Sequence, residues 1–251
     1  MRTSNKIFLS LFALCLLAIS PAKAKTANNM FNHFSLGLST GTDGLVGFHA
    51  AVPIGNYVQM RMGYSFMPVF SYTTDVTVKR ENKPDSRTDI KGKLHMGDFN
   101  WLFDIYPTTK SSFHFTAGCY IGKEKVVTVA NDGPIGGIDE SDYGVAGIAI
   151  GDYLITTDPQ GNAEASIKVK SFKPYLGVGF GRAVPKKRVG VMCDLGVQFW
   201  GKPGVYAHDY LKGDVKVTSQ DIGEKDGGAI KTISKISVFP VISLKVFGRI
   251  L

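Results

Sequence analysis

Three glycines at alternate positions, Gly177, Gly179 and Gly181, have the spacing that most resembles a site for chemistry. A loop that binds the phosphates of a dinucleotide has the pattern G-x-G-x-x-G/A between a strand and a helix. In this chain the last position of the pattern holds Arg182 or Val184, depending on which glycine starts the count, and a proline follows shortly after. The spacing therefore argues against a nucleotide site.

Three histidines, His49, His95 and His114, fall in strand-like segments. A histidine paired with a serine would allow a membrane barrel to cleave or transfer acyl chains. None of the three stands in a recognisable serine or acid motif, and an isolated histidine on a strand is usually a hydrogen-bonded polar residue. We therefore expect no enzyme and no catalytic residue, and we keep an enzyme acting on outer-membrane lipid as the outside alternative.

The densest acidic group is Asp139, Glu140 and Asp142, whose carboxylates have the chemistry to bind a divalent cation. Such a run in a polar, glycine-rich segment is more often a solvated loop. Cys119 and Cys193 form no CxxC motif and stand in no Cys/His cluster with metal-ligand spacing. We therefore expect no metal, no cofactor and no redox role for the cysteines.

The N-terminus has the pattern of a secretory signal peptide. A positively charged start and an apolar run at 7–19 precede an A-x-A cleavage site that ends at Ala24. The run is shorter than the roughly 20 apolar residues that a membrane-spanning helix needs. We expect a signal peptide at 1–24 and one exported domain at 25–251, with a buried N-terminal helix as the alternative. The formal charge of +8 comes from scattered rather than clustered basic residues, so nucleic acid is not an expected partner.

The glycines belong instead to a pattern of period two. Leu176, Val178 and Phe180 alternate with Tyr175 and the glycines, so one face of the segment is apolar and the other is small or polar. The same alternation recurs along the chain and predicts eight strands, each with an apolar face and a polar face. Their limits are 33–41, 45–54, 57–71, 93–106, 112–128, 167–182, 188–201 and 235–251.

The joins between these strands support a transmembrane barrel. The even-numbered joins are tight turns, whereas three of the odd-numbered joins are long, polar and rich in glycine, at about 71–92, 128–166 and 202–234. Short turns at one end and long loops at the other are typical of outer-membrane barrels. We therefore predict an all-β fold, an eight-stranded antiparallel transmembrane β-barrel with short periplasmic turns and three long extracellular loops. A soluble exported barrel or sandwich, with the apolar face inside, is the rival fold.

In a membrane barrel the polar face lines the interior. The polar residues that share this face are Arg61, Asp98, Asn100, Asp104, His114, Asp194, Gln198, Lys245 and Arg249. They either line a path for a small solute or form a paired polar plug. An interior of eight strands is narrow enough to be filled by side chains, and buried charges need partners, so we favour the plug. Arg61 and Lys245 should then lie near Asp98, Asp104 or Asp194. The glycines leave room either for bulky side chains such as Tyr120 and Tyr175 or for a narrow channel.

The stretch KPYLGVGFGRAVPKKRVGVMCDLGVQFWGKPGVY resembles the paired strands near the C-terminal end of small outer-membrane barrels of the OmpW/CarO-like kind. In those proteins, too, a PYLG-G-G strand, a short basic turn and a DLG strand precede a G-P-V segment. The opening GLVGFHAAVPIGNYVQMRMGY is also similar, whereas the long loops are not, and the chain ends in Arg249-Ile250-Leu251 without the terminal aromatic frequent in such barrels. The resemblance implies the architecture rather than a substrate.

We expect an integral barrel of the outer membrane, in contact with outer-membrane lipid and monomeric. Its expected function is a narrow channel for small polar solutes. The alternative is a non-conducting structural or surface-interaction protein that acts through its long extracellular loops.

Overall fold

The computed structural model describes residues 31–68, 70–80, 83–133, 147–150, 153–209, 213–218, 220–221, 231–232 and 234–250. The expected signal peptide at 1–24 and the acidic group at 139–142 lie outside the described residues.

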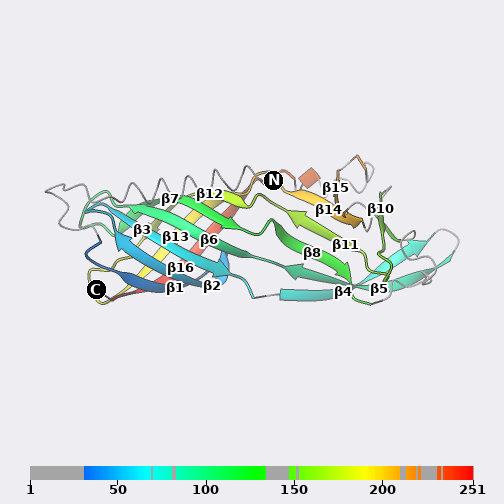
Figure 1. The fold of residues 1–251 in the computed structure, drawn as a ribbon, viewed down its shortest axis with the longest axis horizontal. Helices are drawn as coiled ribbons and strands as arrows, with labels where there is room; N and C mark the ends of the chain where they lie inside the picture. Colours follow the sequence, from blue (N-terminus) through cyan, green and yellow to red (C-terminus); the bar gives the residue numbers. More distant parts are fainter. Residues whose placement is uncertain are drawn as a thin grey trace.

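Eight antiparallel strands close into a barrel, seen in the half of Figure 1 that holds the C-terminus. In spatial order they are β1, β16, β13, β12, β7, β6, β3 and β2, so that β1 pairs with both β16 and β2. Their bounds are β1 (Ser35–Gly41), β2 (Gly44–Pro53), β3 (Val58–Phe66), β6 (Gly97–Ile105), β7 (Phe113–Gly122), β12 (Phe172–Phe180), β13 (Val189–Phe199) and β16 (Val238–Arg249).

The two faces of the barrel strands differ sharply in exposure. Along β16, for example, Ile242 is 55% exposed and Leu244 is 49% exposed, whereas the residues that alternate with them, Val241, Ser243 and Lys245, are buried. The exterior of the barrel is thus apolar and the interior polar, which is the arrangement that a transmembrane barrel requires. The expected eight-stranded antiparallel transmembrane barrel is confirmed, and the soluble rival, which would reverse the two faces, is excluded.

A second sheet of six strands extends the barrel at its long-loop end (Figure 1). Its strands, in spatial order, are β15 (Gly213–Val217), β14 (Gly204–Asp209), β11 (Glu164–Lys168), β8 (Lys125–Asn131), β5 (Lys83–Leu94) and β4 (Phe70–Arg80). The barrel strands next to these in the chain are ordered β16, β13, β12, β7, β6 and β3, so the second sheet keeps the neighbour order of the barrel strands. A separate two-stranded hairpin is formed by β9 (Gly147–Ile150) and β10 (Tyr153–Thr156).

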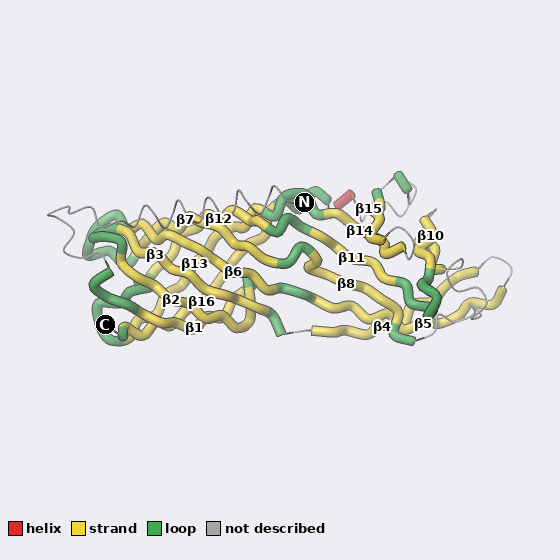
Figure 2. Tube along the Cα trace, viewed as in Figure 1, coloured by secondary structure: helices red, strands yellow, loops and turns green. Residues whose placement is uncertain are grey.

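The three long joins therefore contain strands, where the sequence pattern had predicted loops. Four of the predicted strands were also too long, because short irregular segments separate the barrel from the second sheet; Figure 2 draws them as loop between strands. Backbone hydrogen bonds cross these segments, such as Met67 N to Met96 O at 2.9 Å and Val169 N to Glu124 O at 2.9 Å. The ladder thus continues past the barrel while the strands change direction. Only the hairpin β1–β2 has a tight turn at this end, so the second sheet is open on that side.

Candidate functional site

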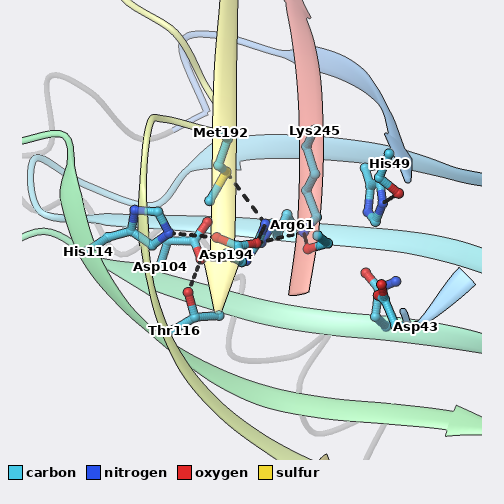
Figure 3. A network of polar contacts seen from close by, with 12 residues as sticks. Asp43, His49, Arg61, Asp104, His114, Thr116, Met192, Asp194 and Lys245 are labelled. Carbon is cyan, nitrogen blue, oxygen red and sulfur yellow. Dashed lines mark hydrogen bonds and ion pairs between the residues drawn. The ribbon is translucent and has the colours of Figure 1, made fainter. Parts of the chain in front are cut away.

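An ion-pair network crosses the middle of the barrel (Figure 3). Arg61 on β3 lies with its Nη1 2.6 Å from Oδ2 of Asp194 on β13 and its Nη2 3.1 Å from Oδ1 of Asp104 on β6. Strands β3 and β13 are four positions apart in either direction around the eight-stranded barrel, so they are diametrically opposed. The Arg61 and Asp194 side chains together thus span the interior, and Arg61 is 0% exposed.

Asp194 is the centre of this network. Lys245 Nζ lies 2.6 Å from Asp194 Oδ2, and His114 Nε2 lies 3.0 Å from Asp194 Oδ1. The hydroxyl of Thr116 donates a hydrogen bond of 2.8 Å to Asp104 Oδ1. Three of the four oxygens of these two carboxylates thus contact a cation or a donor, which offsets part of the cost of removing their charges from water, whereas Asp104 Oδ2 is buried and makes no hydrogen bond with the described residues.

Two further polar contacts close the end of the interior nearest the second sheet. Lys173 Nζ on β12 lies 2.8 Å from both carboxylate oxygens of Asp98 on β6. The hydroxyl of Tyr120 on β7 donates a 3.0 Å hydrogen bond to Oδ2 of Asp43, which belongs to the tight β1–β2 turn. Asp43 is 2% exposed, so this turn folds over the interior rather than into solvent.

The opposite end is closed by the β12–β13 turn, whose residues 183–185 are buried. Gln59 on β3 holds this turn by two hydrogen bonds with Val184: its Nε2 donates to Val184 O at 3.3 Å, and its Oε1 accepts from Val184 N at 3.0 Å. Ser35 Oγ donates to Ala183 O at 2.5 Å. Gly181, with a φ of 112° that side chains disfavour, turns the chain inward at this point.

The interior glycines make space for neighbouring side chains. A Cβ on Gly177 would lie 2.5 Å from Tyr175 Oη, and one on Gly196 would lie 2.4 Å from the same atom. A Cβ on Gly179 would lie 2.5 Å from both His114 Nε2 and Asp194 Oδ1. The glycines of the PYLGVGFG segment therefore make room for interior side chains. Gly177 accommodates the hydroxyl of Tyr175, and Gly179 accommodates the contact between His114 and Asp194.

Eight of the nine residues expected in the interior lie inside the barrel, and none is more than 3% exposed: Arg61, Asp98, Asn100, Asp104, His114, Asp194, Gln198 and Lys245. Whether any of them contacts a solute stays a prediction. Asn100 Nδ2 reaches Ser65 Oγ at 3.4 Å, and Gln198 Oε1 accepts from Trp200 Nε1 at 2.8 Å. Arg249 lies apart, half-buried at the short-turn end.

Sequence reasoning missed several members of this interior. Lys173 and Gln59 share the inward parity of Tyr175 and Arg61, so strict counting along β12 and β3 would have found them. Asp43 carried no such signal, because a turn residue has no face. The inward position of Phe247, which is 0% exposed and lies beside Gly37, also follows from the alternation on β16.

The histidines offer no triad. Ser39 Oγ lies 2.7 Å from His49 Nε2, but His49 Nδ1 is buried and makes no hydrogen bond with the described residues, so no acid orients the ring. His95 lies at the junction of barrel and second sheet and His114 in the central network. Within the described residues no cluster of His, Cys, Asp or Glu could hold a metal ion. No helix in that part of the chain is long and apolar enough to cross a membrane.

A second charged cluster lies on the second sheet, outside the barrel. Asp214 on β15 lies 2.5 Å from Lys168 Nζ, 3.4 Å from Lys125 Nζ and 2.9 Å from His208 Nδ1. Hydrogen bonds from Lys168 and His208 hold the pKa of the Asp214 carboxyl well below its usual range. This cluster joins β8, β11, β14 and β15, and so ties the second sheet together.

The solved structures that are similar to this chain include two crystal structures from Acinetobacter baumannii, CarO2 and CarO. CarO2 is 17% identical, with 88% of this chain and 100% of that chain covered and a TM-score of 0.49. CarO is 18% identical, with 85% and 96% covered and a TM-score of 0.48. No family model matches this chain, and no curated protein does.

Proposed function

We propose that this protein is an integral outer-membrane barrel with a closed interior, which anchors the second sheet at the outer surface of the cell. The proposal rests chiefly on the contact between Arg61 and Asp194, because these residues come from opposite walls and meet at 2.6 Å. Polar contacts toward the two ends of the barrel, Lys173 with Asp98 and Gln59 with Val184, also support this proposal. The non-conducting reading is thus favoured over a narrow channel.

Placement in the membrane is supported by the apolar exterior. Large side chains such as Leu38, Phe48 and Phe180 are more than half exposed on strands whose other face is buried. A surface of this kind in water would be a large aggregation hazard, whereas lipid covers it at no such cost. Tight turns at one end and an extended sheet at the other favour an orientation with the second sheet outside the cell.

Single-channel recording in planar bilayers tests the closed interior. Protein whose insertion has been verified by flotation with lipid vesicles is expected to give no steady conductance. A variant with both Tyr175 and Arg61 replaced by alanine lacks two of the larger interior side chains. It is compared with the unaltered protein as a barrel with more free space in its interior. Steady conductance steps from the unaltered protein, changed when Arg61 or Asp194 is neutralised, would establish the channel instead.

Surface labelling in intact cells tests the orientation. In a background without Cys119 and Cys193, a cysteine in place of the exposed Lys216 on β15 should react with a membrane-impermeant maleimide. A cysteine in place of Lys187, in the β12–β13 turn, should react only after the cells are lysed. The reverse pattern would contradict the proposed orientation.

A further inference from the structure

A pocket of about 380 Å³ lies at the short-turn end of the barrel. This end consists of 31–34, 54–57, 106–112, 181–188 and 248–250. The pocket is lined by residues from all five segments together with Pro53 and Gln59, and its charged members are Arg182, Lys186 and Arg249. A volume of this size is in the range of sites for small molecules.

The floor of the pocket is closed and well ordered by hydrogen bonds. Gln59 and Val184, which line it, are tied to each other by two hydrogen bonds. Tyr106 supports them from below, since its hydroxyl donates to Gln59 Oε1 at 3.1 Å. The pocket is therefore a recess that opens toward the short-turn side and does not continue into the barrel.

Arg182 is held rigidly in the wall of this recess. Its Nη2 donates to Thr109 O at 2.7 Å and to Ser111 O at 3.0 Å, and its guanidinium lies 4.3 Å from the centre of the Tyr106 ring. These are contacts with neutral groups, so they fix the position of the charge without neutralising it. A guanidinium fixed in this way is well suited to bind an oxyanion, because little side-chain entropy is lost on binding.

The charge at this end is unbalanced. Its five segments contain six lysines and arginines, Lys110, Arg182, Lys186, Lys187, Arg188 and Arg249, and no aspartate or glutamate. None of the three cations in the pocket forms an ion pair with the part of the chain that is described, in contrast to the paired lysines of the second sheet. His33, also in the lining, has a buried Nδ1 that makes no hydrogen bond with the described residues.

We propose that this recess is a binding site for a small oxyanion, a phosphate or carboxylate group presented from the short-turn side of the membrane. Arg182, Lys186 and Arg249 supply the charge, and His33 with the amides of Asn32 and Asn56 surrounds the remaining wall. Charge-assisted hydrogen bonds from three cations to one anion account for both the affinity and the selectivity for negative charge. The site does not depend on whether the barrel conducts.

Two pairs of variants separate the site from the general charge of this end. Lys186→Gln and Arg249→Gln remove cations that line the pocket, whereas Lys187→Gln and Arg188→Gln remove cations of the same end that do not. Protein in nanodiscs of phosphatidylcholine is titrated calorimetrically with inorganic phosphate and with glycerol 3-phosphate. Folding of each variant is checked by its heat-dependent shift in gel mobility.

The expected result is saturable binding that is weakened about tenfold or more by Lys186→Gln and Arg249→Gln and less than about twofold by the two controls. Nanodiscs that also contain phosphatidylglycerol distinguish the source of the anion. Competition by this lipid would identify an anionic lipid headgroup as the ligand, and undiminished binding would identify a free solute. Absence of saturable binding, or equal weakening by all four substitutions, would overturn the proposal.

Discussion

Arg61 and Asp194 come from diametrically opposed strands, and their side chains meet at 2.6 Å in the centre of the barrel. The two side chains together therefore bridge the full width of the interior. This contact is possible because an eight-stranded barrel is narrow enough for side chains to fill. The same contact joins two opposite walls of the barrel directly, in addition to the hydrogen-bonded ladder.

Replacement of Arg61 by methionine should destabilise the barrel by about 3–5 kcal/mol, because Asp104 and Asp194 would remain buried with less compensation. Equilibrium unfolding in urea, with the protein in lipid vesicles, measures the change in the free energy of unfolding. Lys187→Met, on an exposed turn, should change this free energy by less than about 0.5 kcal/mol. Similar effects of the two substitutions would contradict the central role of Arg61.

Lys173 and Asp98 should behave as a coupled pair. Lys173→Met leaves a buried carboxylate and Asp98→Asn leaves a buried ammonium group, so each single substitution is expected to be strongly destabilising. In the double variant neither charge is left alone, and its loss of stability should be smaller than the sum of the two by about 0.5–3 kcal/mol. A double-mutant cycle of unfolding free energies tests this, and strict additivity would show that the two groups do not interact.

Gly177→Ala should cost about 1–3 kcal/mol, because the added methyl group would collide with the hydroxyl of Tyr175. The loss should be smaller when Tyr175 is already leucine, which ends before the position of the tyrosine hydroxyl. Gly55→Ala is the matched control, since a Cβ there meets nothing within 4 Å. Equal unfolding free energies for Gly177→Ala and Gly55→Ala would show that the interior is not filled at Gly177.

The charged cluster of the second sheet should depend on pH. The pKa of Asp214 is lowered in the folded protein by Lys168 and His208, so its ionised form stabilises the sheet at pH values above about 4, the usual pKa of an unfolded carboxyl. This stabilisation is lost as the pH falls toward the lower folded pKa. Asp214→Asn should therefore weaken the sheet by about 1 kcal/mol at pH 7, with a difference from the unaltered protein that shrinks below pH 4.

Hydrogen exchange of the β14 and β15 amides, corrected for the intrinsic pH dependence of exchange, measures this difference. The amides of the barrel strand β7 are the internal reference, because Asp214 lies on the second sheet and does not contact this strand. A difference between variant and unaltered protein that stays constant from pH 7 to below pH 4 would refute the electrostatic explanation.

Cys193 should report contact with lipid. It is exposed on the outer face of β13, between Met192 and Asp194 of the interior. In vesicles, and with Cys119 replaced by alanine, a water-soluble maleimide should leave Cys193 unmodified until the protein is unfolded. A lipid-soluble maleimide should modify it in the folded state. Rapid modification by the water-soluble reagent would place this face in water and contradict the membrane assignment.

The sequence by itself determined which residues face inward and which face outward. Alternation is a local property of extended backbone, so the inward position of Arg61 and the outward position of Leu244 follow from counting by two. The unequal joins then indicated a membrane barrel, and the narrowness of eight strands indicated that the inward charges need partners.

Only the tertiary structure decided which charges meet and where the strands end. Partners across the interior, such as Arg61 with Asp194, depend on the stagger with which the barrel closes, which no local pattern encodes. The same holds for the second sheet. Its strands pair beyond the irregular segments near Met67 and Val169, and this pairing depends on which barrel strands are neighbours. The inward fold of the β12–β13 turn likewise depends on a tertiary contact, because Gln59 on β3 holds Val184 by two hydrogen bonds.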